Sequence, residues 1–209
     1  MKLDLINNPI TTARLCGAIA ALPPVEWPWW HRYTGPTGEK YASTDPARLP
    51  SAVIRALDGM AEALEGFLPR GSFWDHDLHG AGVHMMPPGS SLGRHVDAVR
   101  HPVRPWIRTT SAVLFLRTLD GPDPGGELYL EDGDDAVEVL PEAGKAAVFA
   151  TEGQWHGVRE IAQDAGWRLT LALFGWRQAL PNEAVSGQTA AVFQERPVVR
   201  LTPGTIVNF

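Results

Sequence analysis

The sequence changes character at Gly71, and this change limits the possible folds more than any other feature. Beyond it, short segments rich in β-branched and aromatic residues alternate with clusters of Gly, Pro and Asp. Short strands separated by frequent turns are typical of antiparallel sandwiches and barrels. We count at least six strands, at about 82–86, 109–117, 127–131, 136–140, 145–150, 156–161 and 168–175.

Two helices are expected before this region. Val53, Leu57 and Met60 belong to one apolar stripe over 50–68, which should pack on a sheet. A shorter helix is expected over 9–22, where apolar residues again recur at helical spacing. Helices first and strands afterwards indicate an α+β fold that is mainly β.

The segment 27–50 fits neither period. Its Trp and Tyr residues stand among Pro and Gly, which interrupt both helical and strand patterns. We therefore expect an ordered, aromatic-rich loop, and it is one candidate for a lid over a site. The tail at 182–209 contains one short strand pattern, at 197–201.

Composition sets further limits. With 209 residues, 44% of them hydrophobic, the chain can bury one substantial core, so we expect a single domain over 1–209. The net charge of −6 and the pI near 5.6 argue against a nucleic-acid partner. Cys16 is the only cysteine, and no apolar run approaches the roughly 20 residues of a membrane span. We therefore expect a cytoplasmic protein without a membrane segment.

Three side chains form a pattern typical of a metal site. His95 and Asp97 lie two apart, so on an extended segment they project to the same side while Val96 projects to the other. His156 follows 59 residues after Asp97. Two histidines and one carboxylate on one face of an octahedron are diagnostic of non-heme iron(II) oxygenases. A His-x-Asp tripeptide alone is common, so the prediction depends on its context.

Arg168 supplies that context. It lies twelve residues past His156 on an expected strand, where Arg168, Thr170 and Ala172 share one face. A guanidinium pairs bidentately with a carboxylate, and the Thr170 hydroxyl can add a hydrogen bond to the same group. A lone arginine of this kind is usually an exposed strand residue, and only its spacing from His156 favours a role in binding a dicarboxylic acid.

The order of these motifs resembles that of the prolyl 4-hydroxylase-like 2-oxoglutarate oxygenases. The resemblance covers about 80–176 and rests on His95-Val96-Asp97, then GGELYLED, PEAGKAAVF, WHGV and GWRLTLALF. It implies a double-stranded β-helix, a jelly roll of the cupin type, supported by helical residues at 1–70. Gly125-Gly126-Glu127 resembles the family's turn into a core strand, and Gly144 resembles the glycine before a later strand.

The same resemblance implies the chemistry. His95, Asp97 and His156 would bind Fe(II), and Arg168 would bind the outer carboxylate of 2-oxoglutarate, with ascorbate as a candidate reductant. Dioxygen would be consumed, and succinate and carbon dioxide released, as a C–H bond is hydroxylated. Related halogenases have a small residue in place of Asp97, so hydroxylation is favoured over halogenation.

His84 departs from the family pattern. Many relatives have a tyrosine there that contacts the oxo-acid, so His84 either donates to 2-oxoglutarate or is a core histidine bonded to backbone. His76 and His79 could form a second metal site, but the flanking Gly71 and Gly80 favour a solvated loop.

The substrate is less constrained. A basic stretch beside the metal motif would suit an acidic or zwitterionic substrate, although most such clusters are solvated loops. This stretch contains Arg94, Arg100, His101, Arg104 and Arg108. We expect a small molecule, such as an amino acid or related metabolite. A prolyl or other residue in a peptide is the second alternative, and a non-catalytic jelly-roll binding module is the third.

Overall fold

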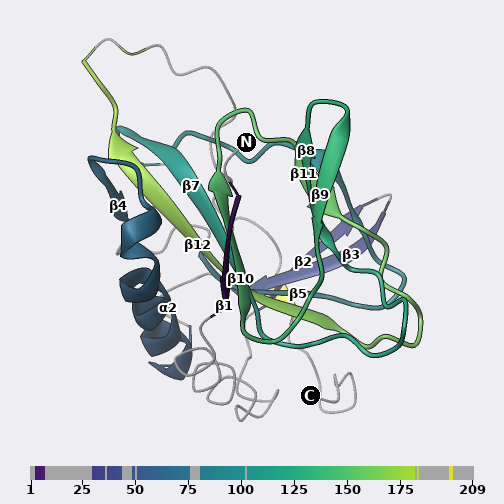
Figure 1. The fold of residues 1–209 in the computed structure, drawn as a ribbon. Coiled ribbons are helices and arrows are strands. Elements are labelled where there is room, and N and C mark those ends of the chain that lie inside the picture. The colour runs from purple at the N-terminus through teal and green to yellow at the C-terminus, as the bar shows by residue number, and fades with distance from the viewer. Residues whose placement is uncertain are drawn as a thin grey trace.

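Antiparallel strands in two sheets make up most of the computed structural model, which describes residues 3–7, 30–35, 37–43, 49, 51–75, 81–101, 103–181, 183 and 198–199 (Figure 1). The nine-stranded sheet has the order β1-β10-β7-β12-β5-β3-β2-β13, with β4 also paired to β12. The four-stranded sheet has the order β6-β11-β8-β9. The strands of the larger sheet are β1 (Leu3–Asn7), β2 (Trp30–Gly35), β3 (Gly38–Ser43), β4 (Ser72–Trp74), β5 (Gly82–Met86), β7 (Trp106–Phe115), β10 (Lys145–Ala150), β12 (Arg168–Gln178) and β13 (Val198–Val199).

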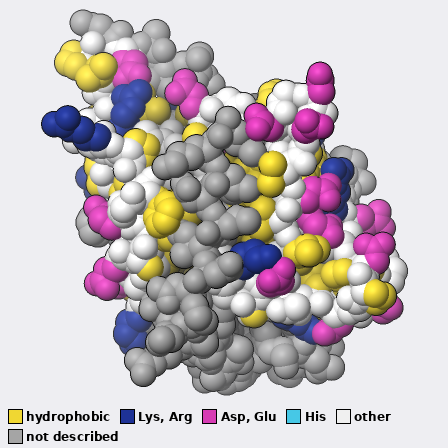
Figure 2. Space-filling model, viewed as in Figure 1, with side chains coloured by type: hydrophobic (Ala, Val, Ile, Leu, Met, Phe, Trp, Pro, Cys, Tyr) yellow, Lys and Arg dark blue, Asp and Glu magenta, His cyan; other side chains and the backbone are white. Residues whose placement is uncertain are grey.

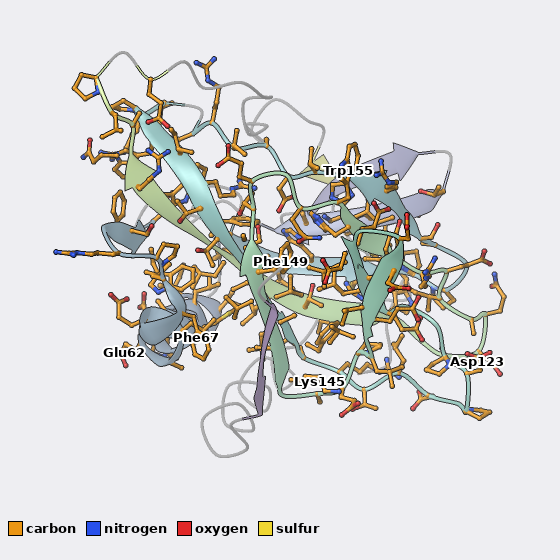
Figure 3. All side chains as sticks on the ribbon, turned by 45° about the horizontal axis from the view of Figure 1, so that its top comes forward. Glu62, Phe67, Asp123, Lys145, Phe149 and Trp155 are labelled. Atoms are coloured by element: carbon orange, nitrogen blue, oxygen red, sulfur yellow. The ribbon has the colours of Figure 1, made fainter. Side chains whose placement is uncertain are left out.

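The smaller sheet consists of β6 (Leu92–His95), β8 (Leu128–Asp132), β9 (Asp135–Val139) and β11 (His156–Val158). Helix α2 (Ser51–Leu64) runs along the outer side of the larger sheet and continues into the 3-10 helix η2 (Glu65–Phe67) (Figures 1 and 3). None of the helices in the described part of the chain is both long and apolar enough to cross a membrane.

Strand β12 lies at the centre of the fold because both of its faces are covered. Leu171 and Leu173 pack in one cluster with Val53 and Leu57 of α2, as the apolar stripe of the helix predicted. Every residue of β12 from Arg168 to Trp176 is buried. A strand buried on both faces lacks the polar and apolar alternation of a half-exposed strand, which explains the nearly continuous apolar sequence.

A second apolar layer fills the space between the two sheets. Phe115 and Phe149 of the larger sheet contact Leu128 and Leu130 of the smaller one. Phe149 points into this space in Figure 3, whereas Trp155 lies at the periphery. The layer holds the sheets face to face, so side chains on their inner faces can meet.

The seven strands predicted beyond Gly71 are all present, with ends shifted by up to a few residues. The expected helix also forms, but its α-helical part ends at Leu64. Strands β4 and β6 were not predicted, because each is very short.

The prediction of a loop over 27–50 is wrong for most of that segment. Residues 30–43 contain the β2–β3 hairpin, and β3 joins the larger sheet by pairing Tyr41 with Met85 and Ala42 with His84. Gly38, at φ +110°, permits the tight turn. Pairing with β5 therefore overrides the weak local pattern. The helix expected over 9–22 and the loop containing His76 and His79 lie outside the described residues, while β13 falls within the strand pattern seen at 197–201.

Candidate metal centre

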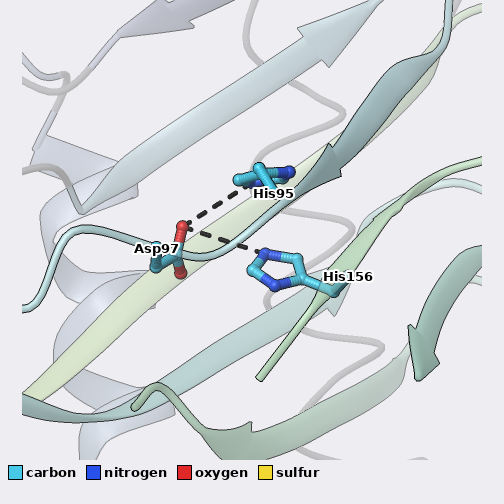
Figure 4. A group of neighbouring side chains, drawn as sticks. All are labelled: His95, Asp97 and His156. Carbon is cyan, nitrogen blue, oxygen red and sulfur yellow. Dashed lines mark ion pairs between the residues drawn. The ribbon is translucent and has the colours of Figure 1, made fainter. Parts of the chain in front are cut away.

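The pairing of β6 with β11 in the smaller sheet brings His95 and His156 together, and the loop after β6 adds Asp97 (Figure 4). His95 ends β6, His156 begins β11, and the two are cross-strand partners. One donor atom from each of the three residues lies within 4.8 Å of the others. Asp97 Oδ1 lies 3.8 Å from Nε2 of both histidines. Val96 is 40% exposed, which agrees with the predicted alternation of faces.

Backbone carbonyls fix the tautomer of both imidazoles. His95 Nδ1 lies 2.9 Å from the Gly93 carbonyl oxygen, and His156 Nδ1 lies 3.0 Å from that of Gln154. A carbonyl oxygen can only accept a hydrogen bond, so each Nδ1 carries a proton and each Nε2 faces Asp97 Oδ1. Burial lowers the pKa of His156, which keeps this imidazole neutral. Both rings are therefore preset as metal ligands.

The two oxygens of Asp97 face different surroundings. Ser111 donates a 2.9 Å hydrogen bond to Oδ2 and is itself 2.9 Å from the Thr151 hydroxyl. Arg108 Nη1 lies 3.8 Å from the same Oδ2. Burial acts to raise the pKa of Asp97, but Arg108, His156, Ser111 and His95 together lower it. The carboxylate is therefore ionised, with Oδ1 directed at the histidines.

Arg108 differs from the rest of the basic stretch. Arg94, Arg100 and Arg104 are exposed, as expected for a solvated segment, but Arg108 is only 5% exposed. Its guanidinium lies 3.8 Å from the ring centroid of Phe174. Burial lowers the pKa of Arg108 to about 10, while Asp97 and Asp75 act to raise it, so it remains a cation at neutral pH. His101 of this stretch is also buried.

A pocket between the sheets joins the three donors to Arg168. Arg168 is 5% exposed, and its Nε donates a 2.8 Å hydrogen bond to the Gly126 carbonyl. Burial lowers its pKa to about 10, and it stays charged at neutral pH. The pocket is lined by Lys40, His84, Met86, Leu92, His95, Asp97, Ser111, Val113, Leu128, Phe149, His156, Val158, Arg168, Thr170, Ala172 and Phe174.

The pocket lining confirms that Arg168, Thr170 and Ala172 share one face. Gly126, at φ +73°, forms the predicted turn that brings its carbonyl to Arg168, and Gly144 immediately precedes β10. His84 also lines the pocket, and its backbone carbonyl accepts a 3.5 Å hydrogen bond from the Thr170 hydroxyl.

Sequence reasoning missed Lys40, Ser111 and Thr151, and it placed Arg108 only in a basic stretch beside the metal motif. Each lies on or next to a strand that reaches the pocket by pairing with distant strands. For Lys40 one signal existed, because Lys40 and Ala42 alternate with the aromatic Tyr41, but the surrounding Pro and Gly concealed it.

Residues 81–176 match a family model described as the 2OG-Fe(II) oxygenase superfamily. The match includes all three converging donors and Arg168. This part of the chain resembles the 2OG-Fe(II) oxygenases. The family uses Fe(II) and 2-oxoglutarate, and a set of two imidazoles and one carboxylate, with the buried cation Arg168 in the same pocket, fits both groups. The family match indicates an enzyme of the dioxygenase or hydroxylase type.

Solved structures confirm the predicted double-stranded β-helix. A prolyl-4-hydroxylase from Pseudomonas putida is 24% identical with a TM-score of 0.53, and the match covers 85% of this chain and 92% of the hydroxylase chain. HygX from Streptomyces hygroscopicus, solved with nickel and 2-oxoglutarate, is 12% identical with a TM-score of 0.57, covering 94% and 92%.

A third structure is the Trichoplax adhaerens prolyl hydroxylase in complex with a peptide fragment of the hypoxia inducible factor oxygen degradation domain. It is 16% identical with a TM-score of 0.57, and covers 83% of each chain. At these identities the likeness is one of fold. No protein of curated function matches the sequence.

Proposed function

We propose that this oxygenase hydroxylates a small molecule, with Fe(II) bound by His95 Nε2, Asp97 Oδ1 and His156 Nε2. The observation that carries the proposal is the convergence of these three atoms, with the Nδ1 of each histidine held by a backbone carbonyl so that its Nε2 faces the site. Asp97 also occupies the position that a halide would need, which favours hydroxylation.

We assign 2-oxoglutarate to the part of the pocket between the metal and Arg168. The buried guanidinium offers a carboxylate a charge-assisted partner, and the Thr170 hydroxyl lies on the same face. His84 is a further candidate contact. With dioxygen as the oxidant, bound Fe(II) and 2-oxoglutarate would supply the chemistry, in which one oxygen atom enters the substrate C–H bond, the other enters succinate, and carbon dioxide is released. The protein holds the reactants, and apolar walls such as Phe149 and Leu128 exclude water.

For the substrate we propose a small acidic or zwitterionic metabolite such as an amino acid, because the pocket is enclosed between two sheets and has a basic lining. The second candidate is a prolyl-type residue in a peptide, which the fold shared with two prolyl hydroxylases favours. We also propose that residues 1–209 form one domain, because a single sheet extends from β1 to β13. We further propose that the protein works in the cytoplasm.

One spectroscopic experiment tests the metal assignment. Anaerobic protein with Fe(II) and 2-oxoglutarate should show the weak visible charge-transfer band of a chelated keto acid. His156→Ala and Asp97→Ala should lose the band and succinate formation. Asp123→Ala, which removes an exposed carboxylate, is the control and should behave as the parent. Full succinate formation by Asp97→Ala would refute the ligand assignment, and absence of succinate formation by the parent protein would favour a non-catalytic binding module.

A second experiment tests the cosubstrate anchor. Arg168→Ala should raise the KM for 2-oxoglutarate at least 10-fold, because a buried carboxylate loses a charged partner whose hydrogen bonds contribute about 1.5–3 kcal/mol. Iron affinity should change little. Arg55→Ala, on the exposed side of α2, is the matched control. An unchanged KM would move the anchor to another residue, with His84 as the next one to replace.

A further inference from the structure

Lys40 is a second, half-buried cation of the pocket that the cosubstrate assignment does not use. It lies on β3, two residues before Ala42, so both side chains project from the same face of the strand. Ala42 pairs with His84, and His84 pairs with Thr170, which places all three residues on the row of the sheet that faces the pocket. Lys40 accordingly lines the pocket with Asp97 and Arg168.

The charge of Lys40 is not neutralised within the described residues. No hydrogen bond or ion pair joins its ammonium to any of them. Burial lowers the pKa of Lys40 to about 8, Asp97 acts to raise it, and Arg168 acts to lower it. Lys40 is therefore mostly protonated at pH 7. Removing an ammonium from water costs free energy unless an anion accompanies it. The position of Lys40 in a ligand pocket therefore indicates an anionic ligand.

Pairing each anion of the occupied site with a cation shows which ligand Lys40 can bind. The two carboxylates of 2-oxoglutarate are assigned to the metal and to Arg168. Asp97 is a metal ligand, and its second oxygen already faces Ser111 and Arg108. Lys40 stands on β3, separated from Arg168 on β12 by β5. With metal and cosubstrate bound, Lys40 is the cation of the lining that is left for the substrate.

We propose that Lys40 binds a carboxylate of the primary substrate, so that this oxygenase acts on a free carboxylic acid, such as an amino acid with an unmodified carboxyl group. This inference rests on the proposed function and narrows its substrate class. A residue inside a peptide chain has no free α-carboxylate, so Lys40 selects against the peptidyl alternative. The β8–β9 hairpin exposes Asp132, Asp135 and Glu138, so the cationic pocket contrasts with acidic side chains on this part of the surface (Figure 2).

The test uses protein loaded with Mn(II), which binds such sites without turnover, and saturating 2-oxoglutarate. Calorimetric titration with the common amino acids and simple carboxylic acids should find binders whose amides bind 10- to 100-fold more weakly, the range expected for one charge-assisted pair. Lys40→Met keeps the length of the side chain and should abolish the difference between acid and amide. Lys145→Met, at a lysine paired with the exposed Glu142, should preserve it.

Binding of 2-oxoglutarate to the Mn(II) protein shows whether the carboxylate that Lys40 binds belongs to the cosubstrate or to the primary substrate. Arg168→Met should weaken it more than 10-fold and Lys40→Met less than threefold. Equal weakening by both variants would assign Lys40 to the cosubstrate and overturn the inference. The inference would also be overturned if the amides in the calorimetric panel bound as tightly as the acids, or if no acid bound. Failure of the parent protein to bind 2-oxoglutarate would instead refute the proposed function itself.

Discussion

The two carboxylate oxygens of Asp97 have different partners. Its Oδ2 receives the hydrogen bond of Ser111 and lies near Arg108, while Oδ1 faces His95 and His156. Partners behind a metal ligand restrict its rotation and so reduce the entropy lost on metal binding. The carboxylate is thereby oriented before the ion arrives.

Ser111→Ala should weaken metal binding roughly 10- to 100-fold, the usual effect of removing a hydrogen bond behind a ligand. The three ligands themselves remain in place. Mn(II) affinity measured by calorimetry checks this, with Ser91→Ala on the turn before β6 as the control. If Ser111→Ala binds Mn(II) like the parent, Arg108 alone orients Asp97.

The pKa of Lys40 gives the acid-binding step a defined pH dependence. Burial lowers this pKa to about 8, so the ammonium is present below that pH and lost above it. The charged or titratable groups that face it in the pocket are Asp97, Arg168, His156 and His84. Affinity for a carboxylic acid should fall about 10-fold for each pH unit above 8, and titrations at pH 7, 8, 9 and 10 measure it. The amide of the same acid should show no such decline.

The residues of the proposed metal site were predictable from the sequence, because the alternation of side chains along a strand and the spacing from His156 to Arg168 depend only on local sequence. The supporting residues were not. Ser111 and Thr151 reach Asp97 through the pairing of β7 with β10, and Lys40 reaches the pocket through the pairing of β3 with β5. Such pairings between distant strands cannot be predicted from the spacing of residues along the chain.

Among the elements, α2 and the strands after Gly71 followed from hydrophobic period and turn residues. The β2–β3 hairpin did not, since its strands depend on an edge supplied by β5. Short edge strands such as β1 and β13 likewise depend on a preformed neighbour, β10 and β2 respectively.

At this scale the contact between α2 and β12 should dominate stability. Leu57 is 1% exposed and packs in the core cluster, so Leu57→Ala should cost about 2–5 kcal/mol of unfolding free energy. Glu62→Ala on the exposed side of the same helix (Figure 3) should change it by no more than about 0.5 kcal/mol. Urea denaturation followed by circular dichroism compares the two. Equal losses would show that α2 is not part of the cooperative core.

For the molecule as a whole, metal binding and folding should be coupled, because the ligands come from β11 and from the end of β6 and the loop that follows it, which meet only in the folded chain. Mn(II) at about 100 times its Kd should add about 2.7 kcal/mol of stability. For a chain of 209 residues this is a rise in Tm of roughly 5–10 °C. Scanning calorimetry should detect the rise in the parent and not in His156→Ala. A rise of equal size in that variant would place the stabilising metal elsewhere.

The order of strands in the larger sheet also governs how quickly the chain reaches its native state. Leu3 pairs with Phe149, and His31 pairs with Val198, so both edges of the sheet join segments that are distant in the sequence. Domains dominated by such distant pairings fold in milliseconds to seconds, because long loops must close before their contacts form. During that interval β12, apolar along nearly its whole length, lacks the strands and helix that cover it. Refolding yield should therefore fall as protein concentration rises, through association of chains whose central strand is still exposed.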